Sequence, residues 1–116
     1  MKSGSSLLTS MEKGLEDAIN IYEANQYDAA GGKQYNMKDY NSALESYTHA
    51  LQIRLKLFGE NHTDTARSYQ SIGVTQRVMK HYKAALESHQ HALQIRLKLY
   101  GEDHAVTATS YNSIGV

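Results

Sequence analysis

Histidines are the side chains of this sequence best suited to chemistry, and their spacing argues against a metal site. The chain has six histidines and no cysteine. His89 and His91 are two residues apart, so on a helix they point to different sides, unlike the i, i+4 pairs that chelate zinc. His62 and His104 each follow a Gly-Glu-Asn or Gly-Glu-Asp sequence, where hydrogen bonding at a helix start is expected. We therefore predict no bound metal.

Catalytic patterns are also missing from the sequence. No nucleophile and base stand at a recognisable spacing, and there is no phosphate-binding glycine loop or paired-carboxylate signature. Glu45 and Glu87 recur, but on a helix face that is expected to be solvated. The nine tyrosines recur at packing positions and lack the surrounding basic charge of a base-stacking platform. The sequence predicts a protein that is not an enzyme and needs no cofactor.

Composition limits the partners and the location. Twelve Lys and Arg balance twelve Asp and Glu, so no basic field for nucleic acid is expected. No apolar run approaches the roughly 18–20 residues that span a bilayer. The apolar stretch near the N-terminus is two leucines, far short of the 7–15 residues of a secretory signal. We expect a cytoplasmic protein with no nucleic-acid or membrane partner.

An internal repeat organises the chain. Residues 40–74 and 82–116 are identical at 25 of 35 aligned positions, at an offset of 42 residues. The same offset aligns Gly31 with Gly73 and Gly115 without a gap. The predicted units are 23–64, 65–106 and a third that opens at 107–116 and is truncated. Such self-similarity is typical of a repeat protein.

Each unit is predicted to hold two helices, over 65–80 and 82–100 in the second unit. The pattern 53–57 alternates like a strand, but helix formers dominate around it, so helix is favoured. Gly59 and Gly101 are expected to end the second helices in a left-handed conformation. The apolar stripe of the second helix is predicted as Leu86, His89, Leu93, Leu97 and Tyr100, and in the earlier copy as Leu44, Tyr47, Leu51, Leu55 and Phe58.

Residues 1–22 match the repeat poorly. Their apolar face predicts a separate capping helix that covers the open end of the array, because terminal repeats need capping. Thr9 and Glu12 have the spacing of a capping box at its start. Gly31-Gly32 makes the first repeat the least secure, since each glycine inside a helix costs about 1 kcal/mol relative to alanine.

The spacing Tyr69-x-x-Ile72-Gly73, Tyr82-x-x-Ala85 and Ala92-Leu93 resembles the tetratricopeptide repeat. The long second helix and its Gly-Glu-(Asn/Asp)-His tail resemble the 42-residue variety of kinesin light chains. The resemblance implies an all-α fold, in which tandem helix-turn-helix repeats stack into a right-handed superhelix, here an α-solenoid fragment. It also implies small residues where the two helices of a unit cross closely.

The same resemblance implies a concave groove lined by the first helices, in which a peptide or helix of a partner protein binds. Arg77 is expected to pair with an acidic side chain or a C-terminal carboxylate. The groove positions carried over from the family are Asn25, Asp28, Tyr35, Asn36, Arg67, Gln70, Val74, Arg77, Val78, Thr109 and Asn112.

Two functions remain open at this point. The first is a protein–protein interaction scaffold that uses this groove. The second is a structural spacer or self-association segment of a larger array, as in a signalling receptor or motor adaptor. The second predicts self-association through the open C-terminal end, near Tyr111 and Ile114.

Overall fold

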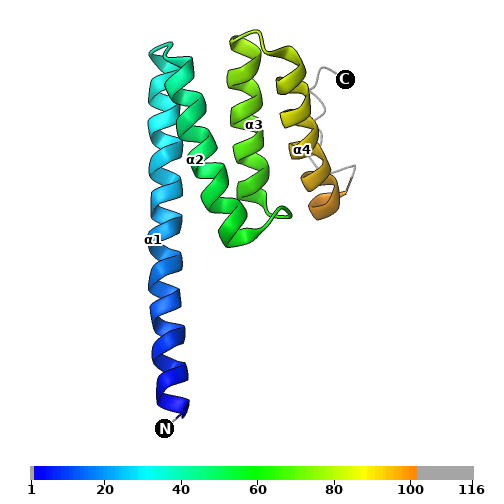
Figure 1. Cartoon of the computed structure of the whole chain (residues 1–116). Helices are drawn as coiled ribbons and strands as arrows, with labels where there is room; N and C mark the ends of the chain where they lie inside the picture. The colour runs from blue at the N-terminus through cyan, green and yellow to red at the C-terminus, as the bar shows by residue number, and fades with distance from the viewer. Residues whose placement is uncertain (1, 102–116) are drawn as a thin grey trace.

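The described part of the chain folds into four helices that form two consecutive antiparallel hairpins (Figure 1). The computed structural model describes residues 2–101, with side chains from residue 6 onward. The helices are α1 (Lys2–Asn36), α2 (Tyr40–Phe58), α3 (Thr63–Val78) and α4 (Tyr82–Tyr100). Helix α1 packs on α2, α2 on α3, and α3 on α4. The all-α repeat architecture predicted from the sequence is confirmed.

The two hairpins close with the same turn. Lys38 and Lys80 are equivalent residues, and both have a left-handed backbone, with φ of 65° and 67°. In each turn the lysine N–H donates to a carbonyl three residues back, over 3.0 Å. The repeat offset therefore holds at the level of backbone geometry as well as sequence.

Glycine ends both second helices, as predicted. Gly59 and Gly101 have φ of 75° and 81°, with ψ of −171° and 176°. The positive φ is the expected one, but the extended ψ places both residues in a region that only glycine occupies readily. Helix α3 then begins two residues earlier than predicted because His62 caps it: its Nδ1 accepts a hydrogen bond of 3.0 Å from the Asp64 N–H.

The core consists of small residues at the helix crossings. Ala24, Ala43, Ala50, Ala66 and Ala92 are each no more than 1% exposed. A methyl group placed on Gly31 would lie 2.7 Å from the Tyr47 ring, and one on Gly73 would lie 2.9 Å from the His89 ring. These are equivalent positions, so the expected close crossing of the two helices is present in both units.

The predicted leucine stripe is wrong as a description of the core. In α4, Leu86 is 44% exposed and Tyr100 is 36% exposed, while Leu93 and Leu97 are half-buried. In α2 all five stripe residues are half-buried. Both helices instead bury alanine, serine and arginine, and α4 also buries Ile95 and His89, the one stripe residue that is fully buried.

The predicted separate capping helix over residues 1–22 is also wrong. Residues 2–36 form one continuous helix, so this segment is the first half of α1. Thr9 lies inside it, and the predicted capping box therefore does not start a helix. No proline interrupts the segment, and neither of its two glycines, Gly4 and Gly14, breaks the helix. The first half of α1 projects beyond α2 and covers neither hairpin (Figure 1).

Candidate functional site

A hollow of about 400 Å³ opens between the two hairpins and is lined by side chains from all four helices. We call it the four-helix hollow. Helix α3 supplies most of its wall, α1 and α2 each supply a tyrosine, and α4 supplies an arginine. Its lining residues are Tyr35, Tyr47, Arg67, Gln70, Ser71, Val74, Thr75 and Arg96.

The polar chemistry of the hollow is best understood from a buried cluster around Arg54 in the first hairpin. The Arg54 side chain is 1% exposed, and its Nη1 lies 2.6 Å from a carboxylate oxygen of Asp28. Nη1 also donates to Ser68 Oγ over 2.8 Å, and Nη2 donates to Asn25 Oδ1 over 3.0 Å. A buried arginine needs such compensation, because an unpaired charge in the interior is costly. In this cluster the guanidinium charge is balanced by the carboxylate.

The second hairpin repeats this arginine with different neighbours. Arg96 is equivalent to Arg54 and is 6% exposed. Gln70 replaces the carboxylate, and its Oε1 accepts a hydrogen bond of 2.5 Å from Arg96 Nη1. Arg67 stands where the first hairpin has Asn25. The same framework therefore holds Arg54 beside Asp28 in the first unit, and Arg96 beside Gln70 and the position of Arg67 in the second.

Electrostatics at the hollow reflect this difference. Burial lowers the pKa of Arg96, Tyr100 acts in the opposite direction, and Arg67 lowers it further. An arginine stays protonated even so. Arg67 also lies 3.4 Å from a carboxylate oxygen of Asp64; the two side chains are 57% and 35% exposed, and a pair this accessible to solvent is weak. Burial, followed by Asp28 and Tyr35, raises the pKa of Tyr47, so its hydroxyl is neutral and can donate a hydrogen bond.

Comparison with known families agrees with this architecture. A tetratricopeptide repeat family profile matches residues 30–98, which is more than half of the chain. The chain belongs to the tetratricopeptide repeat family. No curated protein sequence matches it. Tetratricopeptide repeats generally mediate protein–protein interaction and form a non-catalytic scaffold.

The tetratricopeptide units bring together four of the predicted groove residues, Tyr35, Arg67, Gln70 and Val74. Asn25 and Asp28 do not line the hollow, because their side chains bind Arg54. Asn36, Arg77 and Val78 lie exposed at helix ends outside the hollow. Thr109 and Asn112 lie outside the described residues. The hollow therefore contains one predicted groove position from α1 and three from α3, and binding of a partner at these positions stays a prediction.

Four residues of the hollow were not predicted: Tyr47, Ser71, Thr75 and Arg96. The expectation that only first helices line the groove excluded Tyr47 and Arg96. A signal was present in the sequence, because Arg54 continues the face of Ala43, Tyr47 and Ala50 at helical spacing. A charged residue that recurs on a small-residue face indicates a buried, partnered arginine.

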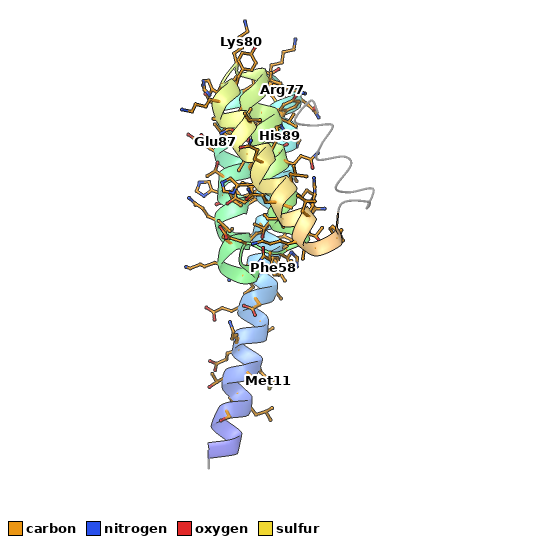
Figure 2. The ribbon with its side chains drawn as sticks, turned by 90° about the vertical axis from the view of Figure 1, so that its right-hand side faces the viewer. Met11, Phe58, Arg77, Lys80, Glu87 and His89 are labelled. Carbon is orange, nitrogen blue, oxygen red and sulfur yellow. The ribbon has the colours of Figure 1, made fainter. Side chains whose placement is uncertain are left out.

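His89 is a packing residue of α4, as the sequence predicted. It is 3% exposed and lies against Gly73 of α3, near the end of the hairpin where Figure 2 also places Arg77. Burial lowers its pKa, and Arg77 and Arg96 lower it further. Among residues 2–101, no three histidine, cysteine, aspartate or glutamate side chains gather in a way that could hold a metal ion. No helix in this part of the chain is both long and apolar enough to cross a membrane.

Proposed function

We propose that this tetratricopeptide segment binds an acidic peptide or helix of a partner protein in the four-helix hollow. One observation carries the proposal: Arg67 and Arg96 both line the four-helix hollow, whereas the equivalent Asn25 and Arg54 of the first hairpin form a buried cluster with Asp28. A guanidinium group recognises a carboxylate through two parallel hydrogen bonds. A partner with an aspartate or glutamate side chain therefore complements this charge.

The other walls of the hollow suit the rest of a peptide. Tyr35 and Tyr47 offer ring surfaces for an apolar side chain, and a tyrosine adds a hydroxyl that can bond to a peptide backbone. Gln70 and Ser71 add polar groups that can both donate and accept hydrogen bonds. The expected ligand is thus a short segment in which an acidic residue adjoins an apolar one.

The cellular location and the type of protein that we propose follow from the resemblance to kinesin light chains. Their 42-residue repeat variety is found in adaptors and signalling receptors, so we propose a cytoplasmic adaptor function for this chain. The proposed partner is a protein, with no role for nucleic acid or membrane.

The chain itself supplies the variant that tests the proposal. Arg67→Asn with Gln70→Asp installs in the second hairpin the residues that the first hairpin already packs around Arg54. This variant should fold, while the hollow loses its excess positive charge. Arg77→Asn, which removes an exposed arginine outside the hollow, is the matched control.

Affinity capture from a cytosolic extract, followed by mass spectrometry, compares wild type, the double variant and Arg77→Asn. The three proteins must first show the same helix content by circular dichroism. We expect partners that are retained by wild type and by Arg77→Asn, and lost with the double variant. Capture of the same proteins by all three would overturn the proposal, and the spacer or self-association function would take its place.

A further inference from the structure

The first half of α1 carries a row of apolar side chains that no described helix covers. Leu8, Met11, Leu15, Ile19 and Tyr22 are 58–67% exposed. Leu7 and Ile21 flank the row and are 63% and 40% exposed. From the typical surface areas of these seven side chains, the exposed apolar surface is roughly 700 Å². This is close to the area that one partner buries in a specific protein–protein interface.

This row faces away from the rest of the molecule. Ala24 and Gly31 are buried against α2, and at 100° per residue the row lies on the opposite side of the helix. Figure 2 shows Met11 on the part of α1 that projects past the end of α2, where Phe58 lies. The row is therefore open along its whole length.

Charged residues are kept off this row. Lys13 and Asp17 form an ion pair of 3.6 Å on the other face of α1. Lys13, Glu16 and Asp17 line a hollow of about 470 Å³ toward the end of α2, together with Lys56. Glu12 and Glu23 border one side of the row. The projecting half of α1 thus has a polar face turned to its own α2 and an apolar face turned outward.

The spacing of the row is symmetric about its centre. The steps from Leu8 to Tyr22 are three, four, four and three residues. Reversing the helix direction therefore gives the same pattern, with Leu15 at the midpoint. Two copies related by a two-fold axis at Leu15 would pair Leu8 with Tyr22, Met11 with Ile19, and Leu15 with itself. A two-fold interface requires this kind of self-complementary surface.

We propose that the projecting half of α1 is a dimerisation segment, in which two copies of this chain pair their helices antiparallel through Leu8, Met11, Leu15, Ile19 and Tyr22. A helix bound to an anionic membrane surface is a poorer match, because four of the five charged residues between 6 and 23 are acidic and such helices carry basic polar faces. The dimer leaves the four-helix hollow on each copy untouched, so it is independent of the proposed peptide binding.

Sedimentation equilibrium of the full chain, from about 1 to 200 µM, tests the association. The wild type should shift from 13.0 kDa toward twice that mass. Leu15→Glu and Leu15→Lys should each weaken association at least about tenfold, because two like charges then meet at the axis. Leu86→Glu alters an exposed leucine of α4 outside the row and should associate like wild type.

Mixing the variants tests the pairing itself. Leu15→Glu with Leu15→Lys should restore the dimer, which a merely misfolded variant could not do. Leu8→Glu should associate with Tyr22→Lys and not with Leu8→Lys, because the helices run antiparallel. The proposal would be overturned if the wild type stayed monomeric at the highest concentration, or if Leu15→Glu and Leu15→Lys associated as strongly as wild type. It would also be overturned if Leu8→Glu associated with Leu8→Lys.

Discussion

Tyr47 and His89 occupy equivalent positions against equivalent glycines, yet only His89 can gain a charge near neutral pH. Its ring is 3% exposed, and its pKa lies below 6.5 because of burial and then of Arg77 and Arg96. In the unfolded chain the same imidazole binds a proton at about pH 6.5. His89 therefore ties the stability of the second hairpin to acidity, whereas Tyr47 in the first hairpin does not.

We expect the free energy of unfolding to fall as the pH drops below about 6.5, since the unfolded state then binds a proton that folded His89 does not. His89→Tyr reproduces the Tyr47 arrangement and should remove part of this loss. Urea titrations at about pH 7 and about pH 5 compare the two proteins. Both proteins contain the other five histidines, so any pH dependence that those residues cause is the same in both. An equal loss of stability in both would show that His89 is not the responsible group.

At the scale of the elements, the crossing of the two helices in each hairpin depends on one glycine. Gly31 leaves no space for a methyl group, since the Tyr47 ring would lie 2.7 Å away, whereas Gly14 in the same helix has nothing within 4 Å. The glycine that the sequence marks as a weak point in a helix is thus a packing requirement of the α1–α2 contact. Its intrinsic cost is offset by the close approach that it permits.

Gly31→Ala should lower the free energy of unfolding by about 1–3 kcal/mol, because the ring and the helix must shift. Gly14→Ala should raise it by up to about 1 kcal/mol through helix propensity alone. Chemical denaturation of the two variants and the wild type makes the comparison. A stabilising effect of Gly31→Ala equal to that of Gly14→Ala would contradict the close crossing.

The elements differ in how far the sequence predicted them. Helix α4 has the predicted bounds, because Gly101 ends it and the duplicated copy gives the same signal. The start of α3 was missed by two residues, since its cap is a histidine and not one of the usual capping residues. The length of α1 was mispredicted because its first half has no counterpart in the repeat, and its apolar face suggested a partner within the chain.

At the scale of the whole molecule, the two hairpins share their crossing geometry and their buried arginine, and differ in the residues around that arginine. Asn25 and Asp28 of the first hairpin correspond to Arg67 and Gln70 of the second, so the carboxylate beside the buried arginine is replaced by an amide. The sequence predicted both changed positions, because they lie on the expected inner face. It did not reveal Arg96 as their neighbour, since that contact joins residues 26 apart across two helices and depends on how the helices cross.

We propose that the four-helix hollow selects acidic peptides through Arg67 and Arg96. The most direct measurement is selection of random peptides displayed on phage against the wild type and against Arg67→Asn with Gln70→Asp. We predict enrichment of aspartate or glutamate beside an apolar residue on the wild type, and loss of that enrichment on the double variant. Enrichment of the same sequences on both proteins, or of sequences without acidic residues on the wild type, would contradict the account.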